Sequence, residues 1–358
     1  MAAPATKGRG SRSNRSGRYE PVAHEDFDDG WGEADEAAPP LKTTLTPERA
    51  KTIITRNDSP DVGFDRSINP YRGCEHGCIY CYARPAHAWM GLSPGLDFES
   101  RLFFKPEGPR LLEQELSKRN YVCKPIHIGG NTDPYQPVER DLLITRGVLE
   151  VLERFDHPFS IITKSNLIAR DADIMGRMAA RGLCVAMVSI TTLDRGLARA
   201  MEPRASTPAK RLEAISRLAE AGCPVGVGFA PVIPGLNDHE LEAVLEAAAK
   251  AGATSAMYVT LRLPLEIKDL FREWLADARP DRAARVMSLI RQTRGGRDYD
   301  PDWNQRMKGT GPVAELIATR FKAAVKRYGL DGPRHVLDES RFRIPPEMKT
   351  QLDLFDAA

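Results

Sequence analysis

The sequence lacks any apolar run long enough to cross a membrane. No stretch of about 18 consecutive apolar residues occurs, and a helical span needs roughly that length. The first 18 residues are rich in Gly, Ser and Arg without an apolar segment, so we expect no secretory signal there. A net charge of only +2 creates no overall field toward nucleic acid or anionic lipid. We therefore expect no membrane partner.

Cysteine is scarce, with six in 358 residues. Cys123, Cys184 and Cys223 are far apart in apolar surroundings, as buried free thiols are. So few cysteines argue against a disulfide framework and favour a reducing, cytoplasmic location. A glycine fingerprint for dinucleotide binding is also missing, because none opens any of the expected helices.

The two ends of the chain differ in composition from its middle. Residues 1–45 pass from a basic stretch to an acidic one with few apolar residues, and we expect a disordered tail because little burial offsets the ordering entropy. We assign 60–295 to a core domain, 296–345 to a C-terminal helical extension and 346–358 to a tail.

Short apolar runs alternate with stretches of helical period across the middle of the chain. The runs lie at 125–129, 159–163, 184–190, 224–229 and 255–260. The helical stretches are 139–154, 170–181, 208–221, 238–251, 280–293 and 312–327. Asn237 and Glu240 have the spacing of a capping box at the start of the fourth helix. The alternation predicts an α/β fold on a parallel sheet, either a barrel-like or an open one, with ligands at the carboxyl ends of the strands.

The remaining three cysteines form one motif. Cys74, Cys78 and Cys81 have the spacing C-x3-C-x2-C within "GCEHGCIYCYAR". Structural zinc usually takes four ligands in two spaced pairs; His76 or His127 could complete a set, but no second pair is visible. A [4Fe–4S] cluster normally takes four thiolates, so three would leave one iron open, as catalytic metal sites do. The motif favours such a cluster and leaves zinc as the alternative.

"CEHGCIYCYAR" resembles the signature of the radical S-adenosylmethionine (radical SAM) superfamily, including the aromatic Tyr80 before the last cysteine. The resemblance implies a partial (β/α)6 barrel of the TIM type, with a [4Fe–4S] cluster on Cys74, Cys78 and Cys81. It further implies that S-adenosylmethionine binds the open iron and is cleaved reductively to a 5′-deoxyadenosyl radical, which abstracts hydrogen from a substrate. An electron donor of the flavodoxin or ferredoxin type would then be a partner.

The resemblance also assigns S-adenosylmethionine contacts to residues that follow the later strands. These candidates are Gly129, Gly130, Asn131, Thr132, Asp133, Lys164, Ser165, Ser189, Thr191, Arg204, Val232 and Ile233, together with Tyr80. Thr132 and Asp133 are favoured for the methionine amino group and Lys164 for its carboxylate. A solvated surface lysine and plain capping of a strand end remain alternatives for Lys164 and for the Ser189 and Thr191 pair.

The branch is indicated by "GGNTDPYQPVE", "ITKSN" and "MEPR", which resemble spore photoproduct lyase and its uncharacterised relatives over about residues 60–290. True lyases repair a thymine photoproduct in DNA and use a cysteine near the loop that corresponds to 129–133. This chain has Asn131 there, and Cys123 lies at the other end of the strand. We therefore expect a lyase-like enzyme with an unassigned substrate, for which nucleic acid is a candidate.

"QLDLF" at 351–355 resembles the peptide by which bacterial repair proteins bind the DNA sliding clamp. Leu352, Leu354 and Phe355 would fill an apolar groove and Gln351 would hydrogen-bond beside it. The alternative is a final turn that docks on the protein's own core. A competing hypothesis for the whole chain is a zinc- or cluster-stabilised protein that binds nucleic acid or the clamp without catalysis.

Overall fold

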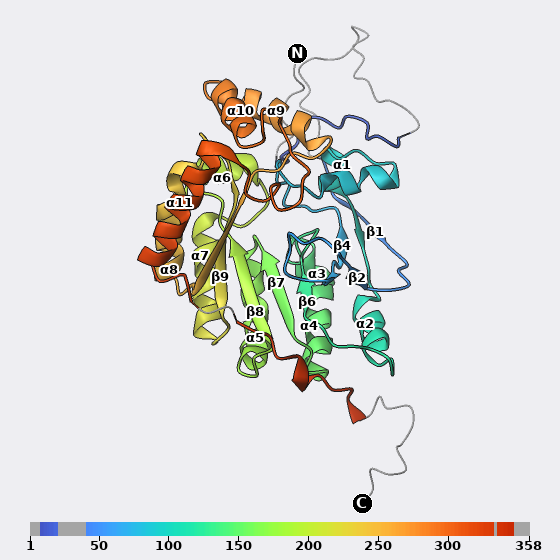
Figure 1. The fold of residues 1–358 in the computed structure, drawn as a ribbon. Helices are drawn as coiled ribbons and strands as arrows, with labels where there is room; N and C mark the ends of the chain where they lie inside the picture. Colours follow the sequence, from blue (N-terminus) through green and yellow to red (C-terminus); the bar gives the residue numbers. More distant parts are fainter. Residues whose placement is uncertain (1–7, 21–40, 333–334, 347–358) are drawn as a thin grey trace, which may run out of the picture.

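The computed structural model describes residues 8–20, 41–332 and 335–346 (Figure 1). Its main sheet has seven strands in the order β10-β9-β8-β7-β6-β3-β2. They are β2 (Ile54–Arg56), β3 (Arg66–Ile68), β6 (Ile126–Ile128), β7 (Phe159–Thr163), β8 (Cys184–Ser189), β9 (Val225–Val232) and β10 (Ser255–Thr260). All neighbours pair in parallel except β2 with β3. The predicted α/β fold is confirmed, and its six parallel strands follow one another in chain order.

Helices connect the parallel strands, and the longer ones pack one against the next in a layer along the sheet (Figure 1). They are α3 (Glu139–Leu142), α4 (Ile144–Arg154), α5 (Ala172–Ala179), α6 (Arg195–Met201), α7 (Pro208–Glu220) and α8 (Leu241–Lys250). Val148, Leu149 and Leu152 of α4 are fully buried in the main core. Burying each such side chain stabilises the fold by about 1.5–3 kcal/mol. No helix in the part of the chain that the structure describes is long and apolar enough to cross a bilayer.

The helix expected over 139–154 is divided. Leu143 has a φ of 55°, so α3 ends there and α4 begins. Glu139 explains the break, because its carboxylate accepts hydrogen bonds from the backbone N–H groups of Thr145 (3.0 Å) and Arg146 (3.3 Å). These are orphan donors at the start of α4, and a carboxylate there also suits the helix dipole.

The capping box expected at Asn237 and Glu240 is wrong. Asn237 instead accepts from the backbone N–H of Ile233 (2.6 Å) and donates to the carbonyl oxygen of Thr191 (2.7 Å). Glu240 accepts from the backbone N–H of Leu193 (2.7 Å). Both side chains join the loop after β8 to the loop after β9. They therefore make contacts between loops and do not cap the helix.

The expected disorder of residues 1–45 does not hold for residues 8–20, while 1–7 and 21–40 lie outside the described residues. Glu99 is fully buried and accepts hydrogen bonds from the backbone N–H groups of Gly10 and Ser11, each 2.8 Å long. Arg9 donates to the Glu99 carbonyl oxygen at 2.6 Å. Residues 9–11 are therefore buried although they have no apolar side chains, because hydrogen bonds to Glu99 satisfy their polar groups.

A second sheet and the remaining helices complete the fold. They are β1 (Thr44–Pro47), β4 (Tyr71–Arg72), β5 (Arg101–Phe104), α1 (Leu96–Ser100), α2 (Gly108–Leu116), α9 (Ile267–Ala278), α10 (Ala283–Gln292) and α11 (Gly311–Arg327). Strands β7 and β8 point toward the end of the molecule where α1, α9 and α10 lie (Figure 1). The residues of the predicted clamp peptide, 351–355, are outside the described part of the chain.

Candidate active site at the carboxyl ends of the strands

The cysteine motif forms a loop directly after β4. Cys74 and Cys78 are buried, Cys81 is partly buried, and all three are free thiols. The backbone N–H of Cys74 donates to the Phe98 carbonyl oxygen at 2.9 Å, and that of Ile79 donates to the Met201 carbonyl oxygen at 3.0 Å. The loop is thus fixed between α1 and α6, at the end of the sheet where ligands bind in this fold class.

A buried ion pair contacts the backbone of the cysteine loop. The Arg84 and Glu99 side chains are both fully buried and pair with each other. Arg84 also donates to the carbonyl oxygens of Cys78 (2.9 Å) and Gly77 (3.2 Å). A guanidinium has five fixed N–H donors, so one side chain can set the path of several backbone segments. The pair therefore shapes the turn that presents the thiols.

The chemistry of the three thiols fits a metal cluster. Burial raises the pKa of Cys74, and Asp133, Cys78 and Cys81 raise it further; a hydrogen bond from the Asp133 backbone N–H acts in the opposite direction. Burial also raises the pKa of Cys78, which Lys164 opposes. Both other thiols of the motif thus act on Cys74, and a bound cation would reverse the effect by favouring its thiolate.

The donor set differs from what a single ion needs. Within the described ranges, no three His, Cys, Asp or Glu side chains gather around one point where a metal ion would be held. In a [4Fe–4S] cluster each thiolate binds its own iron, so the sulfurs need not meet at one point. Three free thiols on one loop are the kind of donors that such a cluster takes.

Asp133 joins the loops after β6 and β7. It accepts hydrogen bonds from the hydroxyl of Thr163 (2.6 Å) and the backbone N–H of Lys164 (2.8 Å), and it lies 3.3 Å from Nδ1 of His76. Burial opposes ionisation, but His76 and these hydrogen bonds outweigh it and lower the pKa of Asp133 to about 2. Both carboxylate oxygens are thus engaged, and the ionised side chain ties the cysteine loop to two strand ends.

The neighbouring loop residues have distinct surroundings. The Thr132 hydroxyl is buried and donates to the Tyr71 carbonyl oxygen at 2.8 Å. Asn131 is exposed, and its backbone N–H donates to the Asn69 side chain at 2.8 Å. Gly130 accepts a hydrogen bond from the Tyr82 hydroxyl. The Tyr82 contact joins the 129–133 loop to the cysteine loop, and the other two join it to the segment just before that loop.

Gly129 is expected to be intolerant of any side chain. Its φ is 90°, and an added Cβ would lie 2.6 Å from the Ile162 carbonyl oxygen. Gly129→Ala should therefore lower the free energy of unfolding by about 1–3 kcal/mol. Gly130→Ala is the matched control, because its Cβ would meet only side-chain ring atoms, of His127 at 3.3 Å and of Phe64 at 3.4 Å, and no backbone atom. Chemical denaturation of the two variants measures the difference; equal stabilities would contradict the expectation.

Lys164 faces the cysteine loop. It is partly buried, and its Nζ lies 5.8 Å from the centroid of the Tyr80 ring. Its positive charge opposes the rise that burial causes in the pKa of Cys78. A solvated surface lysine would not have these neighbours. Ser165 is buried and its hydroxyl accepts from the backbone N–H of Leu167 at 3.2 Å, so it caps the next short helix.

A buried polar network around Glu202 supports Tyr80. Glu202 accepts hydrogen bonds from the Tyr80 hydroxyl and from the Thr191 hydroxyl, the latter at 2.8 Å. Arg211, which is fully buried, pairs with Glu202 and donates to the Ser189 carbonyl oxygen at 3.1 Å. No local pattern marked Arg211 as a site residue, because an arginine on an amphipathic helix normally points to solvent.

The last predicted residues lie at the same end of the sheet. Arg204 is partly exposed and pairs with Glu75 of the cysteine loop at 2.8 Å. Val232 and Ile233 are fully buried, and Ile233 packs in one core cluster with Cys78 and Tyr80. The fold thus brings the predicted residues of five separate loops to one site. Their roles in cofactor binding stay predictions.

Comparison with known proteins identifies relatives along most of the chain. The model of the radical SAM superfamily matches residues 68–248, about half of the sequence. An uncharacterised protein of Mycobacterium tuberculosis is 34% identical over 257 residues, which cover 71% of this chain and 74% of the relative. An uncharacterised protein of Methanocaldococcus jannaschii is 30% identical over 192 residues, 54% of this chain and 69% of the relative.

Solved structures of spore photoproduct lyase resemble this fold. A point mutant superposes with a TM-score of 0.56 at 15% identity, covering 80% of this chain and 79% of that one. The lyase complexed with dinucleoside spore photoproduct gives 0.54 at 13% identity, with 79% of each chain covered. At such identity the likeness establishes the fold alone. Together with the matched family model, it shows that the chain belongs to the radical SAM superfamily, whose members are enzymes that use a [4Fe–4S] cluster and S-adenosylmethionine.

Proposed function

We propose that Cys74, Cys78 and Cys81 hold the [4Fe–4S] cluster and that the chain uses it to abstract hydrogen from a nucleic-acid substrate. The observation that carries the proposal is the position of the cysteine loop, which lies against the carboxyl ends of β6 and β7 through His76 and Asp133. When bound and reduced, the cluster supplies the electron that cleaves S-adenosylmethionine to a 5′-deoxyadenosyl radical.

The protein's own residues position the cofactors and shield them. Lys164 carries a positive charge beside the loop, which suits the carboxylate of the methionine moiety. The Asp133 backbone N–H favours the Cys74 thiolate, and hydrogen bonds to such sulfurs help to set the reduction potential of a cluster. Ile79, Tyr80 and Ile233 bury the inner side of the site. A site that excludes water strengthens these electrostatic interactions and protects a reactive radical from side reactions.

Nucleic acid is proposed as the substrate class because the fold resembles a lyase that has been solved with a dinucleoside photoproduct. The chemistry would differ from thiol-dependent repair, since the 129–133 loop contains no cysteine and Asn131 is exposed there. Cys123 lies before β6, at the opposite end of that strand from the loop. We therefore propose a lyase-like radical reaction without a cysteine hydrogen donor in this loop.

Three further assignments belong to the same proposal. Radical SAM enzymes need an electron donor, for which a flavodoxin or ferredoxin is proposed. Gln351, Leu352, Leu354 and Phe355 are proposed to bind the DNA sliding clamp. A cytoplasmic location follows the small number of cysteines and the need for reduced clusters.

Anaerobic reconstitution with iron and sulfide tests the proposal. The wild-type protein should become brown and, after reduction, convert S-adenosylmethionine to 5′-deoxyadenosine. Deuterium transfer from a labelled oligonucleotide into 5′-deoxyadenosine should then identify nucleic acid as the hydrogen source. A colourless protein with one tightly bound zinc would contradict the proposal. If none of the labelled oligonucleotides transferred deuterium to 5′-deoxyadenosine, the proposed substrate class would be wrong.

A further inference from the structure

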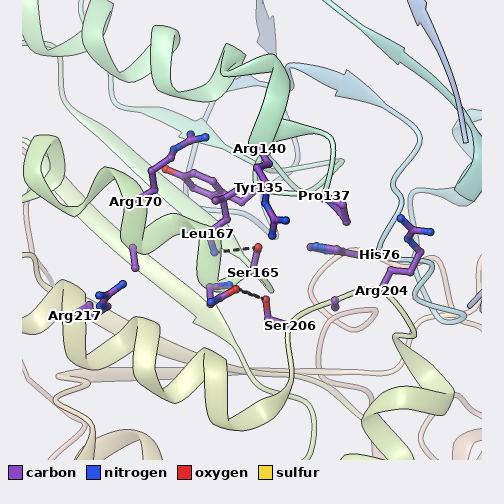
Figure 2. Close-up of a pocket in the computed structure, with 13 residues that line it drawn as sticks. His76, Tyr135, Pro137, Arg140, Ser165, Leu167, Arg170, Arg204, Ser206 and Arg217 are labelled. Carbon is purple, nitrogen blue, oxygen red and sulfur yellow. Dashed lines mark hydrogen bonds between the residues drawn. The ribbon is translucent and has the colours of Figure 1, made fainter.

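A pocket of about 330 Å³ opens beside the cysteine loop (Figure 2). Arg140, Arg170, Arg204 and Arg217 line it, together with His76 of the cysteine loop, and we call it the arginine pocket. None of the described residues that line it is an aspartate or a glutamate. Its polar character and positive charge make it a site for an anion rather than for an apolar ligand.

Two of the four arginines form ion pairs with carboxylates that do not themselves line the pocket. Arg170 pairs with Glu139 at 2.9 Å and with Asp171 at 2.8 Å. Arg204 pairs with Glu75 at 2.8 Å. These two side chains have fixed positions and little net charge to offer, so they form the walls of the pocket.

The other two arginines have no such partner. Arg140 on α3 and Arg217 on α7 are exposed, and neither forms an ion pair or a side-chain hydrogen bond with another residue in the described ranges. Lys210, which binds the Glu213 carboxylate at 2.6 Å, lowers the pKa of Glu213, and the charge of Arg217 adds to this effect without a direct contact. Arg140 points into the space beside His76 and Ser165, and Arg217 lies at the opposite end from Arg204 (Figure 2).

Neutral donors add directionality to this charge. Oδ1 of Asn166 accepts from the Ser206 hydroxyl at 2.9 Å, so the amide NH₂ of Asn166 remains available as a donor. Both residues line the pocket. A guanidinium donates two parallel hydrogen bonds to phosphate oxygens, and an amide adds a third direction. This combination is suited to a phosphate group.

We propose that the arginine pocket binds a phosphate of the nucleic-acid substrate, an inference that rests on the proposed function. Ser165 and Arg204 belong both to this pocket and to the predicted cofactor-binding set, so a phosphate held here would anchor a strand next to the reacting centre. A cavity of about 330 Å³ has room for a phosphate together with part of the strand that carries it. Docking of an acidic protein would instead need a total interface of roughly 1,200 Å² or more.

Binding of a fluorescein-labelled single-stranded oligodeoxynucleotide to the reconstituted full chain tests the inference by fluorescence anisotropy. Arg140→Ala/Arg217→Ala should bind about tenfold more weakly, and the slope of log K against log salt should become about one unit shallower. The matched control is Arg119→Ala/Arg285→Ala, which removes the same charge from exposed positions outside the pocket. Equal losses in both double variants would overturn the inference.

Competition experiments separate the possible sources of the phosphate. An unlabelled oligonucleotide should displace the probe at much lower concentration than thymidine 5′-monophosphate or inorganic phosphate at the same ionic strength. Equal competition per phosphate would overturn the assignment to a nucleic-acid strand. If the Arg140→Ala/Arg217→Ala variant bound the oligonucleotide normally but were reduced more slowly by flavodoxin, the pocket would be a docking site for an acidic electron donor and the inference would be wrong.

Formation of 5′-deoxyadenosine by the wild-type protein distinguishes failure of this inference from failure of the proposed function. Wild-type turnover together with unchanged oligonucleotide binding in the Arg140→Ala/Arg217→Ala variant would overturn only the phosphate site. Absence of a cluster and of turnover in the wild type would overturn the proposed function itself. Tighter binding restored by Arg140→Lys/Arg217→Lys would support a role for charge at these two positions.

Discussion

Cys78→Ala is expected to abolish cleavage of S-adenosylmethionine. Cys78 is buried in the core cluster with Ile79 and Tyr80, so no other thiol can replace it without moving the loop. Two thiolates would remain for a cluster that normally takes at least three protein ligands in this superfamily. The loss should exceed the roughly 100-fold that removal of a group behind a metal ligand typically costs.

The measurement is iron and sulfide content together with 5′-deoxyadenosine formation after anaerobic reconstitution. Cys123→Ala is the matched control, because Cys123 is a partly buried cysteine outside the motif. It should keep the iron content and the turnover of the wild type. A Cys78→Ala protein that retained a wild-type cluster would contradict the ligand assignment, and zinc in its place would favour the alternative of a structural metal.

Glu99→Ala should destabilise the fold by about 3–5 kcal/mol. The substitution leaves the Arg84 guanidinium fully buried without its counter-ion, and it also removes the acceptor of the Gly10 and Ser11 backbone N–H groups. A buried charge or donor that loses its partner carries the full cost of its desolvation. Because Arg84 binds the carbonyl oxygens of Gly77 and Cys78, the cysteine loop should loosen as well.

Denaturant unfolding of the apoprotein measures this loss, and iron retention after reconstitution reports on the loop. Glu150→Ala is the control, since Glu150 pairs with Arg146 on an exposed helix surface and its removal should cost less than about 1 kcal/mol. Glu99→Gln, which keeps hydrogen-bond acceptance on one oxygen, should fall between the two. Equal stabilities of Glu99→Ala and Glu150→Ala would show that the buried pair is not needed.

Local patterns predicted the regular part of the fold. The apolar run at 159–163 coincides with β7, and the runs at 184–190 and 255–260 correspond to β8 and β10. The helix expected at 208–221 is α7, with Pro208 at its first turn. Strand β3 and helix α9 were not predicted, because β3 has only one apolar residue among its three and α9 follows a strand-end loop whose length no local rule fixes.

The burial of charged residues could not be predicted from the sequence. The basic residues near the start indicated a solvated tail, yet Arg9 is buried against the Glu99 carbonyl group. Arg211 had the pattern of a surface residue and instead pairs with Glu202 inside the site. A charged side chain can be buried only with a partner, and that partner lies far away in sequence, so no local window reveals the pair.

The strand–helix alternation and the cysteine spacing, and hence the superfamily, can be read from the amino-acid sequence, because each depends on residues within a few positions of one another. Which side chains support the thiols, and which line the arginine pocket, became visible in the folded chain. Those sets combine loops from separate strands, and their geometry arises when the parallel sheet brings the carboxyl ends of its strands together.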